Sequence, residues 1–525
     1  MLIRTPGNFK ASRSGLSRAI LLFVAACGLL LASGCNQGDE SNTGPSITMA
    51  PNPDTPLVGI LNWTTDVPTR ISLDVSDGSD SWEINFDEFK AAHSLPILGF
   101  RPGKQHTISV RAIDEDNNES VASLVVNTDP LPEDFPEINV VSNPDEMEPG
   151  ITLFPAGDFL IAVNETGEVV WYHRVGLPGG VDRDLRRLKN GDLLLLLPMS
   201  RIIEIDMLGN LVQMWHASLR NEGDIGSTPV AAEAFHHDVF EMENGNFLVL
   251  SHHVRLVDNF PTSDTDPDAP RETATVADDV VVEFARDGTI VNQWSMMDLL
   301  DPLRIGYGSI GAGLAQYYPE VQEPIRDWGH ANAVVHDPRD DSIIVSLRHQ
   351  DAVVKFSRKT GEIIWILGPN ENWDPDEFGD FLLTPTNDME FFWQYHQHAP
   401  MLNLESDTII MYDNGNFRAS PFDIPIPGEA NFSRAVEYSI NEGMRQITQV
   451  WEYGQFADEI VFTPFIGDAD SLPETGNVLI TFGGILSGRQ ARIIEVTHTT
   501  PAEKVFDLSV NDFVYRSERL SSLYP

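Results

Sequence analysis

The chain has 525 residues, of which 42% are hydrophobic, and a formal net charge of −45 from 79 acidic and 34 basic residues. This size and composition are typical of a globular protein with more than one core. The acidic balance excludes nucleic acid and anionic membrane surfaces as partners, because both require a basic surface. Any site for an anion must therefore be a local, inward-facing cationic pocket.

Residues 1–35 have the features of a lipoprotein signal peptide. Basic residues precede an apolar run from Ala19 to Leu31, which is too short to span a bilayer, and small residues then lead to Cys35. We expect Cys35 to be lipidated, giving an exported lipoprotein, periplasmic or anchored in the outer membrane, with residues 36–46 as a tether. Because Leu31 lies one position further from the cysteine than is common, cleavage without lipidation is the alternative.

Residues 47–130 are predicted to form a small β-sandwich resembling fibronectin type III. Short runs of alternating polar and apolar residues, such as 71–75 and 107–112, are separated by turns rich in Gly, Pro, Asn and Asp. The acidic, proline-containing stretch 129–137 is the expected boundary with the next domain.

Residues 137–525 contain a sixfold repeat. A turn followed by an apolar run with an aromatic residue recurs at Trp171, Trp215, Trp294, Trp365, Trp451 and Phe506. Most repeats have a second turn and apolar run before this one, so each supplies two pairs of strands. The repeat predicts an all-β fold, a six-bladed β-propeller preceded by the sandwich. The alternative is an irregular β-protein with these residues in its core. We expect the insertion 258–276 to be an exposed loop.

Three repeats carry a histidine at the start of a strand-like run, namely His236, His330 and His398. The innermost strands of a propeller line a central channel, so histidines at one phase of the repeat are expected to converge there. Asp238 and Asn332 lie two residues further along and should face the same side of their strands.

Arg348, on the following strand, aligns with His253 and Asn414 of the neighbouring repeats. Convergent imidazoles beside a guanidinium form a cationic cavity, in which Asp238, His253 and Asn414 are further candidates for substrate binding. Such a cavity suits transfer of an anionic tetrahedral group. One neutral imidazole would be the nucleophile, another the proton donor, and Arg348 would hold the oxygens. This chemistry needs no cofactor.

Two other functions use the same histidines. A metal-dependent hydrolase or lyase would bind its ion through His236, His330 and His398. Arg348 opposes a dication, however, and we expect no metal. A noncatalytic binding propeller would instead dock a surface partner through the sandwich and outer blades.

The chain resembles the bacterial arylsulfate sulfotransferase family. The resemblance rests on residues 328–333, the spacing from His330 to Arg348, the run from His236 to Asp238, and Gln397-His398. It covers nearly the whole mature chain and implies a β-sandwich joined to a six-bladed propeller in an exported protein. Members move a sulfuryl group from a phenolic sulfate ester to a phenol without a nucleotide sulfate donor.

The resemblance also implies roles for the site residues. His398 would become sulfated, and the sulfuryl oxygens would be held by His236, His330, Asn332 and Arg348. One of the two binding histidines would act as acid and then base, giving ping-pong kinetics. The implied partners are an aryl sulfate donor and a phenol acceptor. From the signal pattern we expect membrane contact through the lipid anchor only, and the chain could assemble as a homodimer. Where some members have a hydroxyl residue in the last blade, this chain has Ile466 and Gly467, with Thr463 nearby.

Overall fold

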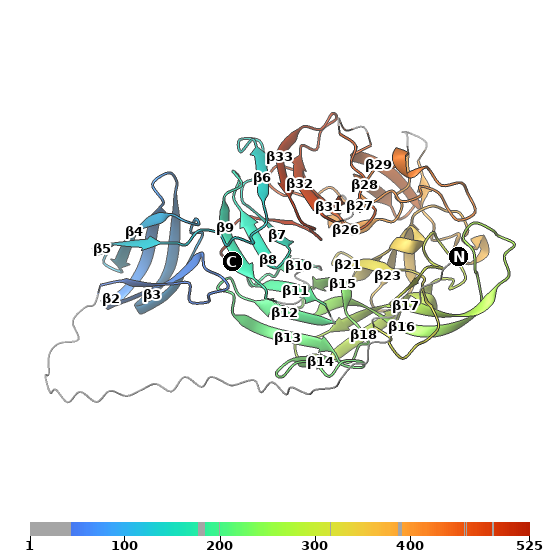
Figure 1. Ribbon diagram of the computed structural model, residues 1–525, viewed down its shortest axis with the longest axis horizontal. Coiled ribbons are helices and arrows are strands. Elements are labelled where there is room, and N and C mark those ends of the chain that lie inside the picture. The colour runs from blue at the N-terminus through green and yellow to red at the C-terminus, as the bar shows by residue number, and fades with distance from the viewer. Residues whose placement is uncertain are drawn as a thin grey trace, which may run out of the picture. The chain divides into compact units, whose positions relative to one another are not determined.

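A computed structural model describes residues 44–176, 184–198, 200–314, 317–386, 391–455, 457, 459–485 and 488–525. Strands dominate this part of the chain, which confirms the predicted all-β class (Figure 1). The helical segments described are single turns, namely α1 (Met296–Leu299), α2 (Pro375–Phe378) and the 3-10 turns Arg348–Gln350 and Gly428–Ala430.

The N-terminal domain is a hydrogen-bonded sheet of five strands in the order β1-β2-β4-β5, with β3 also paired to β2. Its strands are β1 (Ser46–Met49), β2 (Val58–Ser76), β3 (Ser81–Leu98), β4 (Gln105–Asp114) and β5 (Glu119–Asn127). The pairing of β2 with β3 shifts register after Thr64 and again after Thr69. Bulges of this kind bend a long hairpin, so that one face can surround a small core.

The rest of the described chain forms six sheets, which we number in the chain order of their central strands. Sheet 1 contains β7 (Ile151–Ala156), β8 (Phe159–Val163), β9 (Val169–Arg174) and β34 (Glu518–Leu520). Sheet 2 contains β10 (Leu185–Arg187), β11 (Leu193–Leu197), β12 (Arg201–Ile205), β13 (Leu211–Ala217) and β14 (Thr228–Val230). Sheet 3 contains β15 (His236–Glu241), β16 (Phe247–Phe260), β17 (Glu272–Phe284), β18 (Ile290–Ser295), β19 (Ala312–Gly313) and β20 (Ile325–Asp327).

The remaining three sheets follow the same antiparallel plan. Sheet 4 contains β21 (Ala331–Asp337), β22 (Ser342–Leu347), β23 (Ala352–Ser357) and β24 (Ile363–Leu367). Sheet 5 contains β25 (Thr384–Pro385), β26 (His398–Asn403), β27 (Thr408–Asp413), β28 (Arg434–Asn441) and β29 (Gln446–Tyr453). Sheet 6 contains β30 (Asp468–Ser471), β31 (Val478–Ile485), β32 (Gln490–Val496), β33 (Lys504–Val510) and β6 (Ile138–Ser142).

The sixfold sequence repeat maps onto these sheets one to one. The repeated aromatic residues lie on β9, β13, β18, β24, β29 and β33, each the fourth antiparallel strand of a different sheet. All six are buried, because they fill the space between neighbouring sheets. Their recurrence in the sequence therefore reflects one packing position repeated around the domain.

Both ends of the propeller segment close the set of sheets. The first strand, β6, pairs with β33 of sheet 6, and the last strand, β34, pairs with β7 of sheet 1. Sheets 1 and 6 are each completed by a strand from the opposite end of the segment. Unfolding either terminus would therefore leave an unpaired sheet edge, which proteins avoid.

The N-terminal sheet shares a hydrophobic core cluster with sheets 1 and 6, including Trp63, Phe100, Phe154 and Leu479. A hydrogen bond from Asn52 Nδ2 to the carbonyl of Gly209 at 2.7 Å also joins the N-terminal domain to the turn between β12 and β13 of sheet 2. Residues 1–43 are not described, so the predicted signal peptide, most of the tether and Cys35 lie outside the structure. No described helix has the length and hydrophobicity to cross a membrane.

The insertion expected as a loop over residues 258–276 is only partly a loop. β16 continues to Phe260 and β17 begins at Glu272, so the two strands project as one long hairpin. Pairing along the hairpin satisfies backbone groups that a loop would leave to water, and the polar composition reflects its exposure.

Candidate active site

The candidate site lies where sheets 3, 4 and 5 meet at their innermost strands. His236 and His398 are the first residues of β15 and β26, His330 directly precedes β21, and Arg348 directly follows β22. The backbone N–H of Arg348 donates to the carbonyl of His330 at 3.2 Å, which fixes these two residues beside each other. A run of ring contacts joins the histidines from His236 through His237 to His330, at centroid distances of 5.0 and 4.8 Å.

His398 is held by Asn414, and the contact defines which ring nitrogen is free. Asn414 Nδ2 donates to the carbonyls of Thr463 and Ile466, both at 2.8 Å, so its Oδ1 must accept from His398 Nδ1 at 2.6 Å. The proton of the neutral ring is then on Nδ1, and Nε2 carries the lone pair. Burial, and next Arg348, lower the pKa of His398 well below its ordinary value. His398 therefore has the properties of a neutral nucleophile at Nε2.

Arg348 is a cation held by neutral groups. It donates to the carbonyl of Pro464 at 3.0 Å and to His349 Nε2 at 2.7 Å. Its Nε is buried without a hydrogen-bond partner among the described residues, and burial lowers the pKa of Arg348 to about 10, so the group stays charged at neutral pH. A partly buried guanidinium that carries its charge beside imidazoles is suited to a sulfuryl or phosphoryl oxygen.

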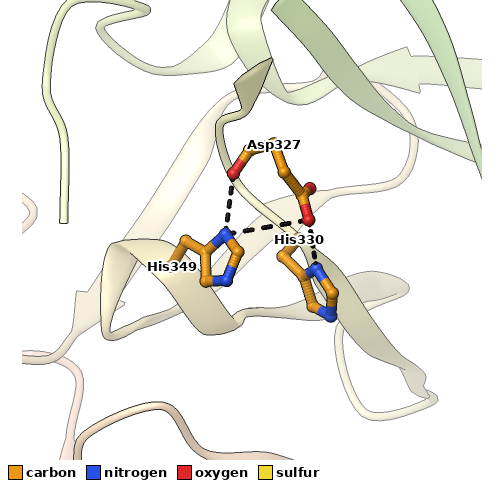
Figure 2. A group of neighbouring side chains, drawn as sticks. All are labelled: Asp327, His330 and His349. Carbon is orange, nitrogen blue, oxygen red and sulfur yellow. Dashed lines mark hydrogen bonds and ion pairs between the residues drawn. The ribbon is translucent and has the colours of Figure 1, made fainter. Parts of the chain in front are cut away.

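His330 belongs to a hydrogen-bonded group with Asp327 and His349, shown in Figure 2. His330 Nδ1 donates to Asp327 Oδ2 at 2.6 Å, and His349 Nδ1 donates to the backbone carbonyl of Asp327 at 2.7 Å. The side chain of His330 is 25% exposed, whereas His398 is only 3% exposed. His330 is thus the more accessible imidazole, and its Nε2 is the nitrogen directed away from the carboxylate.

His236 lies in a different environment from His330. Its Nδ1 is 2.8 Å from Nδ1 of His237, and its ring stacks on His252 at a centroid distance of 5.0 Å. Burial, and next the neighbouring His252, lower the pKa of His236 well below its ordinary value. The ring is therefore neutral, and its buried Nε2 lacks a hydrogen-bond partner among the described residues.

Left-handed backbone conformations occur at three of the clustered histidines. The φ angles are 60° at His237, 51° at His330 and 54° at His396. This region is sparsely populated by residues other than glycine, and such strain is concentrated at functional sites. Here it lets consecutive residues turn their side chains toward one cluster as the chain enters β15, β21 and β26.

The predicted phase of the repeat needs a correction. When β15, β21 and β26 are aligned at their last residues, Asn332 takes the position of His236 and His398, and His330 aligns with His396. Each strand has an irregular register near its start, which the sequence pattern does not reveal. His330 reaches the cluster because of this local geometry, and not because it shares the phase of the other two.

Three candidates for substrate binding have other partners. Asp238 is fully buried and accepts from Arg516 at 3.0 Å, from Arg186 at 3.2 Å and from the N–H of Val334 at 2.9 Å. Its carboxylate therefore organises the hub and does not face a ligand. His253 is half-buried, with Nε2 at 3.3 Å from Asp278, on the projecting part of β16.

Asn332 also has an internal partner. Its Nδ2 donates to the carbonyl of Gln397 at 2.7 Å, directly before His398, and its Oδ1 is buried without a partner among the described residues. This contact positions the start of β26 against β21. Asn414, the fourth candidate, contacts His398 itself, as described above.

The structure adds Asp327 and His349 to the site. The sequence pattern singled out neither residue as functional. Asp327 lies three residues before His330, and a carboxylate this close to a candidate catalytic histidine is a signal that could have been used. His349 could not be recognised in this way, because its role depends on a turn that directs both of its ring nitrogens to specific partners.

The only histidine and carboxylate cluster among the described residues that could hold a metal ion consists of Asp327, His330 and His349. Its donor set fits a metal poorly. His349 uses Nδ1 for the Asp327 carbonyl and Nε2 for Arg348, so neither nitrogen has a free lone pair. A dication would also lie beside the guanidinium of Arg348, which repels it.

Residues 137–516 match the family described as Arylsulfotransferase (ASST). The arylsulfate sulfotransferase AssT of Escherichia coli O6:H1 (strain CFT073) is 28% identical over 246 residues, which are 40% of this chain and 40% of the relative. The arylsulfate sulfotransferase AssT of Lelliottia amnigena is 28% identical over 213 residues, 34% of this chain and 35% of its own. The matched region thus spans less than half the length of these relatives.

Solved structures show more distant similarity. The dihydro-heme d1 dehydrogenase NirN is 11% identical with a TM-score of 0.33, over 79% of this chain and 73% of its own. An auxiliary nutrient binding protein from Bacteroides thetaiotaomicron is 8% identical with a TM-score of 0.31, over 85% and 81% of the two chains. Because the family match extends over most of the sequence, the chain belongs to the arylsulfotransferase family.

Proposed function

We propose that this protein is an arylsulfate sulfotransferase that moves a sulfuryl group from a phenolic sulfate ester to a phenolic acceptor through a sulfated His398. The observation that carries the proposal is the contact between Asn414 and His398. It leaves a buried, neutral imidazole with its lone pair on Nε2 beside the charged Arg348. Family membership and the names of the two curated relatives support the substrate class.

The reaction proceeds in two half-reactions. In the first, Nε2 of His398 attacks sulfur, the bond from sulfur to the aryl oxygen breaks, and that oxygen takes a proton from His236 or His330. In the second, the same histidine removes the proton of the acceptor phenol, whose oxygen attacks sulfur and releases His398. Arg348 stabilises the charge on the equatorial oxygens in both transition states. A phenol leaves readily because its pKa is only about 10.

No nucleotide sulfate donor and no metal takes part in this scheme. The alternative is a metal-dependent hydrolase or lyase with His236, His330 and His398 as ligands. It is disfavoured because the described group that could hold an ion is instead Asp327, His330 and His349, and both ring nitrogens of His349 are engaged. A noncatalytic binding propeller has no specific contact in its favour. We further propose that the protein is exported and anchored by lipid at Cys35, since residues 1–35 have the pattern of a lipoprotein signal. Labelling with an alkyne fatty acid, lost in Cys35→Ser, tests the anchor.

The decisive experiment measures the mass of the intact protein after rapid mixing with 4-nitrophenyl sulfate in the absence of acceptor. We expect one added sulfuryl group on the wild type, mapped to His398 by peptide analysis, and none on His398→Asn. His216→Asn is the matched control, because His216 is also buried but bonds Ser227 away from the site. A folded His398→Asn protein that still transfers sulfuryl groups would disprove the assignment.

A further inference from the structure

Asp327 contacts the candidate site through two different oxygen atoms (Figure 2). Its Oδ2 accepts from His330 Nδ1 at 2.6 Å, and its backbone carbonyl accepts from His349 Nδ1 at 2.7 Å. His349 in turn accepts from Arg348 at 2.7 Å. One residue at the end of β20 therefore holds the accessible imidazole directly and the guanidinium through one intermediate ring.

The Asp327 carboxylate is ionised in this environment. Burial alone would raise its pKa, but the adjacent His330 lowers it well below the ordinary value, with His349 and His252 adding to the effect. The nearby carboxyl of Asp279 differs, because burial and then Asp327 raise its pKa well above the ordinary range. Asp279 therefore stays neutral and accepts the N–H of Ala331 at 2.9 Å. The negative charge at His330 comes from Asp327.

A carboxylate at Nδ1 stabilises the protonated form of an imidazole and directs its other N–H outward. His330 has this arrangement and His236 does not, because His236 Nδ1 meets another imidazole at 2.8 Å. The remaining groups around His330 are His237 and His349, in ring contact, and Arg348 on the adjacent turn. Within this cluster Asp327 is the carboxylate that holds the Nδ1–H of His330 and directs its Nε2 outward.

We infer that Asp327 is a positioning residue that makes His330, and not His236, the proton donor to the departing phenol and the base toward the accepting phenol. The inference rests on the proposed function. As the bond from sulfur to the aryl oxygen breaks, that oxygen receives its electron pair and the proton from His330 Nε2, while Nδ1–H stays on Asp327. In the second half-reaction, neutral His330 takes the acceptor's proton at Nε2 and returns to the imidazolium.

The test varies the leaving phenol. A proton donor matters most for a basic leaving group and least for one that departs easily as its anion. We therefore compare kcat/KM of the wild type and Asp327→Asn for phenyl sulfate, 4-chlorophenyl sulfate and 4-nitrophenyl sulfate. Asp327→Asn leaves the backbone carbonyl that holds His349. We expect phenyl sulfate to lose about 100-fold, since general acid catalysis contributes at least about that much, and 4-nitrophenyl sulfate to lose less than about threefold.

Two further variants separate positioning from structure. Asp351→Asn is the matched control, because Asp351 is a buried carboxylate that contacts His396 at 3.1 Å, as Asp327 contacts His330. In Asp351→Asn, kcat/KM should not depend more steeply on the leaving phenol than it does in the wild type. His330→Gln removes the proton donor directly and should reproduce the pattern of Asp327→Asn, which keeps the test valid if the latter folds poorly.

The possible results have distinct meanings. An equal loss for all three donors in Asp327→Asn, or a steep dependence in His236→Gln and a flat one in His330→Gln, would overturn the inference while leaving the sulfohistidine intact. Failure of the wild type to form any sulfated protein would instead remove the proposed function. The leaving-group dependence is not changed by a general loss of stability, so a merely structural role for Asp327 gives a different result.

Discussion

Replacing Asn414 with alanine should impair the proposed nucleophile by a predictable amount. The substitution removes the acceptor of His398 Nδ1–H and the two hydrogen bonds to the carbonyls of Thr463 and Ile466, all of them buried. An unsatisfied buried group costs about 1–3 kcal/mol. In the wild type the hydrogen bond to Asn414 stabilises the Nδ1–H tautomer of neutral His398 by about this energy. The substitution removes that stabilisation. At about 1.36 kcal/mol per factor of ten, kcat/KM should fall about 5- to 150-fold.

The assay measures sulfuryl transfer from 4-nitrophenyl sulfate, with the burst of 4-nitrophenol as a second readout of the first half-reaction. The Ile466 carbonyl would lose its partner, whereas the Thr463 carbonyl still accepts from Ser433 Oγ at 3.3 Å. The unfolding free energy should therefore also fall by about 1–3 kcal/mol. Asn477→Ala is the matched control, because Asn477 is 5% exposed and donates to Glu146 and Glu495 at 3.0 and 2.8 Å. It should lose stability while kcat/KM is retained. If Asn414→Ala keeps kcat/KM within about twofold of the wild type, the tautomer argument is wrong.

Three other outcomes are expected. Arg348→Lys should lower kcat/KM about 10- to 100-fold, since an ammonium cannot reproduce the fork of donors, and steady-state kinetics checks this. Transfer should be unchanged after dialysis against EDTA, and a loss that zinc restores would favour the metal-dependent alternative. Burial raises the pKa of Asp184, which retains a proton beside Asp238. Because the pKa of Asp184 is higher in the folded than in the unfolded protein, this residue stabilises the fold fully below its unfolded pKa of about 3.9. That stabilisation is lost as the pH rises toward the folded pKa. Between pH 5 and 8 the melting temperature of the wild type should therefore fall more steeply than that of Asp184→Asn.

The fold could be predicted because the buried aromatic residues recur in the sequence at equivalent positions of the six sheets. Trp171, Trp215, Trp365 and their equivalents fill one kind of site between adjacent sheets, so the sequence must repeat wherever the structure does. Strand positions followed from the same pattern. The strand ends of the hairpin around residues 258–276 were missed because the polar, proline-containing tip between them hides the apolar residues Phe260, Ala274 and Val276, which are buried.

The site was predictable only in part. The repeat pointed to the inner ends of sheets 3, 4 and 5 as the place of the candidate site, but the phase it assigned to His330 did not hold, because the strands have irregular registers near their starts. The partners of each side chain did not follow, because they come from distant segments. Asp238 was expected to face the substrate, but Arg516, which lies 278 residues further along the chain, occupies its carboxylate.

Electrostatics explain how a strongly acidic protein could hold the anionic substrate proposed above. With 79 acidic and 34 basic residues, nearly every arginine can find a carboxylate. Inside the propeller, Arg186 and Arg516 both form ion pairs with Asp238, and Arg434 forms one with Asp413. Arg348 does not, since its hydrogen bonds go to a carbonyl and an imidazole and no described carboxylate forms an ion pair with it. A largely desolvated cation without a carboxylate in direct contact is costly. A sulfate ester would supply the missing negative charge, and the acidic exterior is screened from it beyond about 8 Å. An anionic ester would relieve the cost of leaving Arg348 without a carboxylate partner, whereas a neutral phenol would not. This difference would let the protein select the anion.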